Sequence, residues 1–98
     1  MNLHKEASFG AAAKSLMENE VYKRAFGETR AAILKKWEEC PLRDKEGQHE
    51  LKLMLKLLND LEANIKQAAD TGKLAEIQIA QEREKESRLK SILRAVTE

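Results

Sequence analysis

The sequence predicts an all-α protein: an antiparallel helical hairpin with a short N-terminal helix and a long C-terminal helix. Of 98 residues, 36% are charged and 42% apolar, while only one is Pro and four are Gly, a composition typical of helical proteins. Apolar residues recur between residues 51 and 68 at alternating steps of three and four, the period of a helix seam. The few turn signals divide a single domain into a segment 1–18, a hairpin 19–72 and a helix 73–98.

The charge pattern gives no reason to expect a phosphate-bearing partner. Acidic and basic residues are nearly equal in every third of the chain, and the net charge is +1. The single cysteine, Cys40, has no partner for an internal disulfide, which is typical of a reducing compartment. The first residues lack the apolar run of a secretory signal, and no segment is apolar enough to span a membrane. These features predict a cytosolic protein.

Two helices are expected before residue 40. A short one covers residues 11–17 and is anchored by Phe9. The next begins after Asn19, a suitable N-cap, and runs to Glu39 with Phe26, Ile33 and Trp37 on its apolar side. Gly27 lies inside it at a cost of about 1 kcal/mol relative to alanine, which predicts a close helix approach or a kink.

A short turn joins this helix to the leucine-rich one. Cys40-Pro41 ends the first helix because proline disfavours helical geometry at the residue before it. Asp44 is the expected N-cap of the second. About four residues separate the helices, a length that makes them antiparallel. Thr71-Gly72 is expected to end the second helix, with Gly72 in the left-handed position after its last turn.

The leucine-rich helix has more apolar surface than one neighbour can cover. Its expected buried seam and the leucines that widen it are Leu51, Met54, Leu58, Leu61, Ile65 and Ala68, with Leu53, Leu55 and Leu57. The helix of Trp37 covers one side, and the flank marked by Leu53 and Leu57 stays open. This surplus favours self-association or docking onto a partner.

The C-terminal helix is polar in its middle, residues 81–88, and apolar in its last two turns. Those turns are expected to contact either the rest of the chain or a partner. Together with the open flank they give the predicted partner or oligomer interface, which comprises Leu53, Leu57, Leu61, Leu89, Ile92, Leu93 and Val96.

The sequence contains no pattern that indicates catalysis or a cofactor. His4, His49 and Cys40 are the only nitrogen or sulfur ligands, and their spacing fits no metal motif. Cys40 beside His49 would form a thiol–imidazole pair across the turn, but a small apolar residue at a helix end is the favoured interpretation. No metal, no cofactor and no enzymatic activity are predicted.

The residues from Trp37-Glu-Glu-Cys-Pro-Leu-Arg-Asp-Lys-Glu-Gly through the leucine-rich helix to Thr71-Gly-Lys-Leu-Ala resemble small helical-hairpin proteins of tailed bacteriophages. The likeness covers roughly residues 16 to 80, and Leu42 interrupts the Pro-Arg pair of the pattern. It implies a phage or prophage origin, in the host cytoplasm or the virion, and it assigns no catalytic residue.

Three functional hypotheses follow. The first is a non-catalytic virion or assembly component that oligomerises or docks on a larger phage or host protein. The second is an anti-defence protein that binds a host factor or sequesters a cyclic nucleotide, because the Cys40-Pro41 turn is loosely similar to phage nucleotide sponges. The third is a small DNA-packaging or DNA-binding subunit. Its candidate contacts are Lys23, Arg24, Arg30, Lys35 and Lys36, joined by Arg43.

Overall fold

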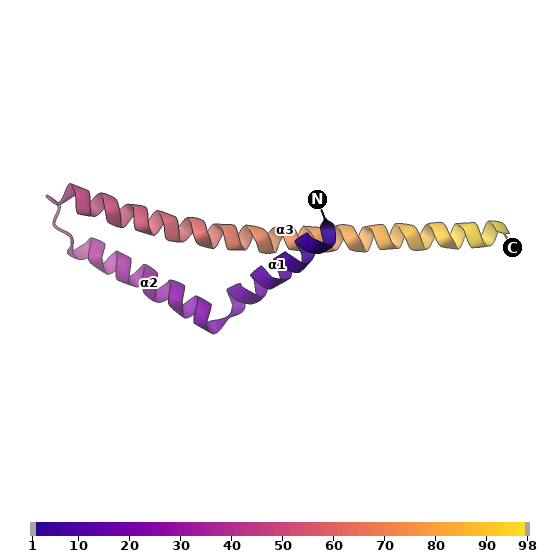
Figure 1. Cartoon of the computed structure of the whole chain (residues 1–98), viewed down its shortest axis with the longest axis horizontal. Coiled ribbons are helices and arrows are strands. Elements are labelled where there is room, and N and C mark those ends of the chain that lie inside the picture. Colours follow the sequence, from indigo (N-terminus) through magenta and orange to yellow (C-terminus); the bar gives the residue numbers. More distant parts are fainter. Residues whose placement is uncertain (1, 98) are drawn as a thin grey trace.

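The computed structural model describes residues 2–97, and they form three helices without a strand: α1 (Leu3–Glu18), α2 (Glu20–Glu39) and α3 (Lys45–Thr97). The all-helical prediction is therefore confirmed. Met1 and Glu98, which end the predicted domain, lie outside the described residues. The molecule is long and flat, 83 × 25 × 15 Å, because α3 runs its whole length while α1 and α2 form a V beside its first half (Figure 1).

Polar side chains cap the start of all three helices. The Asn2 side chain accepts hydrogen bonds from the backbone of His4 and Lys5, at 3.1 and 3.3 Å, so α1 begins well before the predicted residue 11. Asn19 accepts from the Tyr22 N–H at 3.0 Å, and Asp44 accepts from the Gly47 N–H at 2.9 Å. The caps predicted at Asn19 and Asp44 are confirmed, since each satisfies an N–H that the first helical turn leaves unpaired.

The turn between α2 and α3 is closed by hydrogen bonds to the Pro41 carbonyl. The Asp44 N–H and the Gln48 Nε2 both donate to it at 3.0 Å. Further from the turn, Arg30 of α2 contacts Asn59 and Glu62 of α3. The contacting residues are thus further apart in the sequence the further they lie from the turn. This pattern shows that α2 and α3 run antiparallel, as the short connection predicted.

Gly72 does not end a helix, which corrects the predicted boundary between residues 72 and 73. α3 continues through it for 53 residues in all, and no described residue has a positive φ. Gly72 is buried where α1 crosses α3, against Gly10. A Cβ on Gly10 would collide with the Cα of Gly72 and lie 2.8 Å from the Ala68 carbonyl oxygen. The glycine is needed for close backbone approach rather than for a turn.

The crossing of α1 and α3 provides the only buried apolar side chains among residues 2–97, Ala13 and Ala75. Small residues at a crossing let two helix axes approach, so van der Waals contact there is between backbones rather than large side chains. The tertiary structure of this chain therefore depends on a narrow contact and not on a conventional core.

Two details of the predicted seam are wrong. Met54 and Leu61 are exposed, whereas Leu55 is half-buried on the face of α3 that also carries Leu51 and Leu58. This face includes Glu62, which contacts α2. Leu51, Leu58, Ile65 and Ala68 are half-buried, as expected, so the seam differs only where Leu55 and Glu62 replace Met54 and Leu61. The orientation of α2, set by the turn, decides which side of α3 is covered.

Gly27 makes no close approach, contrary to the first of its two predicted roles. A Cβ at this position would meet nothing within 4 Å, and α2 is a single helix from Glu20 to Glu39. Gly27 thus has the same helical backbone conformation as Gly72 but none of its contacts. It can therefore serve as a control for a substitution at Gly72.

Candidate interaction surfaces

The first candidate surface is an uncovered apolar row on the N-terminal half of α3, which we call the proximal stripe: Leu53, Met54, Leu57 and Leu61. All four side chains are exposed, Leu57 the most at 68%. They lie beside the half-buried Leu51, Leu55 and Leu58 face, and neither α1 nor α2 covers them. The flank that the sequence predicted to lack a cover inside the hairpin is open in the structure.

The second surface is near the C-terminal end of α3 and is called the distal stripe: Leu89, Ile92, Leu93 and Val96. Their exposed fractions run from 56% to 77%. Every residue from 80 to 97 is exposed, since this part of α3 projects beyond α1 as a single helix (Figure 1). These turns were predicted to contact either the rest of the chain or a partner, and among residues 2–97 the first of these contacts does not form.

An apolar groove between α1 and α3 was not predicted. Phe9, Ala12, Ala13 and Leu16 form one wall, and Asn64, Ile65 and Ala68 form the other. Phe9 is 67% exposed at its rim. The signal was present in the sequence, because Phe9, Ala12, Ala13 and Leu16 have helical spacing, but it is only recognised if α1 is extended back to Leu3.

Arg30 connects α2 to α3 through two side chains. One guanidinium nitrogen lies 2.8 Å from the Glu62 Oε1 and 3.0 Å from the Asn59 Oδ1. The Arg30 and Glu62 side chains are 32% and 35% exposed, so water only partly screens the pair. Tyr22 lies beside it and packs on Phe26 with ring centroids 4.5 Å apart.

The Tyr22 phenol should report on this ion pair. Desolvation raises its pKa above 10.0, the nearby Glu62 charge raises it further, and Arg30 lowers it. We therefore expect Arg30→Gln to raise the pKa of Tyr22 and Glu62→Gln to lower it. Tyrosinate absorbance measures this directly, because Tyr22 is the only tyrosine. An unchanged titration in both variants would show that Tyr22 does not sense the pair.

The raised Tyr22 pKa also fixes the sign of a pH effect on stability. The folded state holds this proton more tightly than the unfolded state does. The contribution of Tyr22 is thus fully present below the unfolded pKa near 10 and is lost as the pH rises through the folded pKa.

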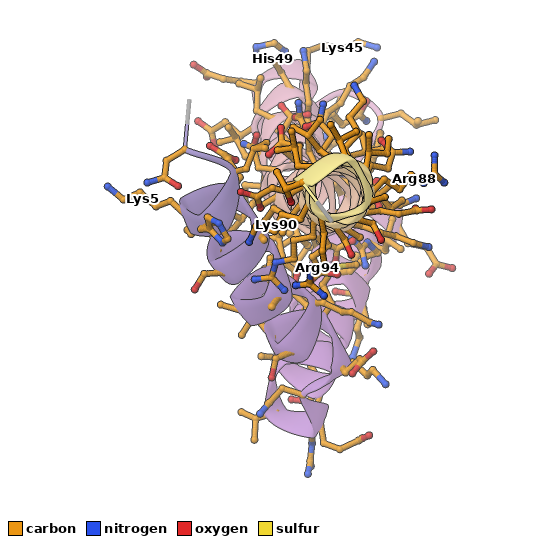
Figure 2. All side chains as sticks on the ribbon, turned by 90° about the vertical axis from the view of Figure 1, so that its right-hand side faces the viewer. Lys5, Lys45, His49, Arg88, Lys90 and Arg94 are labelled. Atoms are coloured by element: carbon orange, nitrogen blue, oxygen red, sulfur yellow. The ribbon has the colours of Figure 1, made fainter. Side chains whose placement is uncertain are left out.

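The Cys40 thiol lies among oxygen atoms rather than beside an imidazole. Its sulfur is 3.8 Å from the Pro41 carbonyl oxygen and 3.9 Å from the Asp44 Oδ2. His49 is exposed and projects outward (Figure 2). Burial, the Asp44 charge and the contact to Asp44 all raise the pKa of Cys40. This environment disfavours the thiolate, which is the nucleophilic form.

We accordingly expect Cys40 to react with iodoacetamide at near-neutral pH several-fold more slowly than the same thiol in the urea-unfolded chain. Asp44→Asn should accelerate the reaction of the folded protein, because it removes the charge but keeps a capping side chain. Mass spectrometry of the alkylated fraction measures both rates. Faster alkylation in the folded state than in urea would contradict this assignment.

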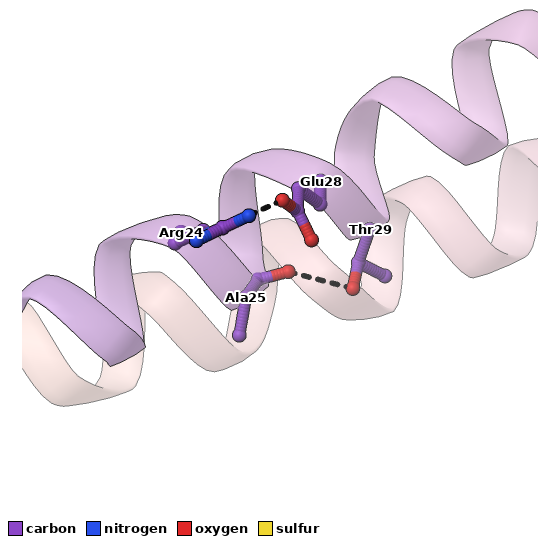
Figure 3. Close-up of polar contacts among 4 residues, drawn as sticks. All are labelled: Arg24, Ala25, Glu28 and Thr29. Atoms are coloured by element: carbon purple, nitrogen blue, oxygen red, sulfur yellow. Dashed lines mark hydrogen bonds and ion pairs between the residues drawn. The ribbon is translucent and has the colours of Figure 1, made fainter.

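Three of the five basic side chains of α2 are paired with carboxylates. Arg24 Nε lies 2.8 Å from the Glu28 Oε1, next to the Thr29 hydroxyl that donates to the Ala25 carbonyl at 2.7 Å (Figure 3). Lys23 lies 3.9 Å from Glu20, and Arg30 is bonded to Glu62. Because binding to phosphates requires uncompensated positive charge, these pairs weaken α2 as a nucleic-acid surface.

Residues 2–97 contain neither a cluster of metal ligands nor a helix suited to crossing a membrane. Within this range, no group of three or more His, Cys, Asp or Glu side chains is close enough to hold a metal ion. None of the helices in it combines the length and the apolar character that crossing a bilayer needs.

Comparison with known proteins identifies no relative. No family model matches the chain, and neither a curated protein nor a solved structure is significantly similar to it. The resemblance to phage hairpin proteins therefore stays a prediction.

Proposed function

We propose that this chain is a non-catalytic protein–protein interaction component that binds through the uncovered apolar stripes of α3. The observation that supports the proposal is the exposure of all seven predicted interface residues, between 45% for Leu53 and 77% for Val96. Rows of leucine, isoleucine and valine on one helix are costly to keep in water, at roughly 25 cal/mol per Å² of apolar area. Contiguous exposed apolar surface of this kind is typical of binding sites.

The biological setting of the proposal depends on the phage resemblance. In that setting the chain is a virion or assembly component, and its partners are further copies of itself, a larger phage protein or a host protein. The carboxylate pairing of Lys23, Arg24 and Arg30 supports a protein partner over DNA or a nucleotide.

Site-specific photocrosslinking in the producing cell tests the proposal. A benzophenone side chain at Leu57 or Ile92 should give protein adducts, because both side chains lie in the stripes. The same group at Lys56 or Ser91, exposed neighbours on the same helix, serves as the matched control. Adducts at the stripe positions no stronger than at the controls would overturn the proposal. The mass of each adduct shows whether the partner is this chain or another protein.

A further inference from the structure

The two apolar stripes of α3 share a single seven-residue register. Met54, Leu57 and Leu61 in the proximal stripe are each 35 residues before Leu89, Ile92 and Val96 in the distal stripe. Thirty-five residues are five heptads, so in a coiled coil the corresponding members of the two rows would face the partner in the same way. Between the two rows, the positions of this register either hold polar residues or are covered by α1.

These rows cannot meet within one chain. They belong to one uninterrupted helix, and 35 residues at 1.5 Å per residue separate them by about 52 Å. Contact between them within a chain would require α3 to break and fold back on itself. Between two chains, by contrast, a stagger of five heptads brings them together directly.

We propose that the chain assembles head to tail: the distal stripe of one copy packs in parallel on the proximal stripe of the next. This inference rests on the proposed function and names its partner, a second copy. Leu89, Ile92 and Val96 of one copy form layers with Met54, Leu57 and Leu61 of the next. Leu93 and Leu53, the remaining members of the two stripes, occupy facing flank positions in the same register.

The position of α1 decides between a parallel and an antiparallel arrangement. In an antiparallel pair with the same stripes in contact, the centre of the interface falls near Ala75 of both copies. α1 covers this part of α3, where Gly72 and Ala75 are buried, so the two long helices cannot approach. With the parallel stagger, the segment of one copy that α1 covers aligns with positions before Lys45 of the next copy. Because α3 of the next copy begins only at Lys45, α1 does not separate the two paired helices.

The lengths of the two free segments agree with the parallel stagger. The bare helix 80–97 aligns with residues 45–62, the part of α3 that precedes the crossing of α1. Lys85 falls in the same layer as Glu50 of the next copy, which places opposite charges together. Glu46 and Glu86 fall in facing flank positions, where their two negative charges repel each other. A substitution that reverses the charge of Glu46 is therefore expected to strengthen the contact.

A head-to-tail contact uses two different surfaces, so each added copy leaves one of each free. Such heterologous assembly is open and does not stop at a dimer. Its strength must be modest, since the overlap is shorter than three heptads. The expected behaviour is a mass that increases steadily with protein concentration.

Sedimentation velocity over roughly a hundredfold range of concentration tests the assembly. We expect the wild-type mass to exceed that of a dimer at the upper end. Ile92→Asp in the distal stripe or Leu57→Asp in the proximal stripe should weaken association about tenfold or more, because each buries a carboxylate in an apolar layer. Ser91→Asp, with the same added charge on the exposed face, should leave it unchanged, and Glu46→Lys should strengthen it.

Mixing the two defective variants distinguishes this assembly from a symmetric dimer. The Leu57→Asp copy retains a functional distal stripe, and the Ile92→Asp copy retains a functional proximal stripe. Together they should form a one-to-one heterodimer that grows no further. Circular dichroism establishes that each variant keeps its helices, and the projecting end of α3 has no contact with the body that a substitution would break.

Disulfide trapping tests the register itself. With Cys40→Ser as background, Glu50→Cys combined with Lys85→Cys should oxidise to a ladder of dimers, trimers and longer chains on a non-reducing gel. Leu57→Cys combined with Leu89→Cys pairs two different layers and should give little product. A wild type that stays monomeric, a mass that stops at two copies, or an absent ladder would each overturn the head-to-tail arrangement. Photoadducts with other proteins alone would leave the proposed function standing and remove only this inference.

Discussion

Replacing Gly72 with alanine is expected to lower the free energy of unfolding by about 2 kcal/mol and to release α1 from α3. A methyl group at this position collides with the Gly10 Cα and lies 3.0 Å from the Glu6 carbonyl oxygen. Overpacking typically costs 1–3 kcal/mol, and the upper end applies here because the obstacle is backbone that moves only with the whole helix. Alanine returns about 1 kcal/mol of helix propensity.

Gly27→Ala is the matched control for this prediction. Gly27 is also helical, but a methyl group there meets nothing within 4 Å. It should therefore stabilise the protein by up to about 1 kcal/mol, the propensity gain alone. Urea unfolding followed by circular dichroism measures both changes, and hydrogen exchange shows whether α1 loses protection in Gly72→Ala. Equal effects of the two substitutions would mean that the crossing does not hold α1.

Arg30→Glu is expected to have the second largest effect, a loss of about 1–2 kcal/mol in the free energy of unfolding. It removes the 2.8 Å ion pair with Glu62 and places two carboxylates together on partly shielded side chains. The hydrogen bond from Arg30 to Asn59 is lost as well. Fluorescence of Trp37, the only tryptophan and a residue of α2, follows the detachment of this helix.

The charge-swapped double variant, Arg30→Glu with Glu62→Arg, tests the cause of this loss. If the ion pair is responsible, the double variant should recover most of the stability, and added salt should reduce the defect of Arg30→Glu. If the double variant is as unstable as the sum of the two single ones, the pair contributes nothing and the loss arises from packing.

Local signals predicted both ends of α2 and the start of α3. Asn19 and Asp44 were identified as caps because capping depends on side chains two or three residues away, and Pro41 ends a helix through its own covalent geometry. These effects need no knowledge of the fold, so the hairpin connection followed from the sequence alone.

Gly72 shows where sequence reasoning stopped. A glycine near polar residues fits a helix end as well as a close crossing, and the choice depends on Gly10, 62 positions earlier in the chain. The error in the covered face of α3, where Leu55 is half-buried and Met54 and Leu61 are exposed, has the same cause: α2, which is distant in the sequence, decides which face is covered. The open flank at Leu53 and Leu57 was predicted because apolar surplus is a property of α3 itself, whereas its partner is not encoded locally.

The projection of α3 beyond its crossing with α1 implies that this helix is not one cooperative unit. Near Gly72, opening an amide requires α1 to detach, whereas from residue 80 onward only helix propensity and pairs such as Glu84 with Arg88 oppose fraying. Amide protection should therefore decline along α3 toward Thr97. Any partner of the distal stripe then bears part of the free energy of ordering the last turns, which makes binding measurable as a gain in helicity.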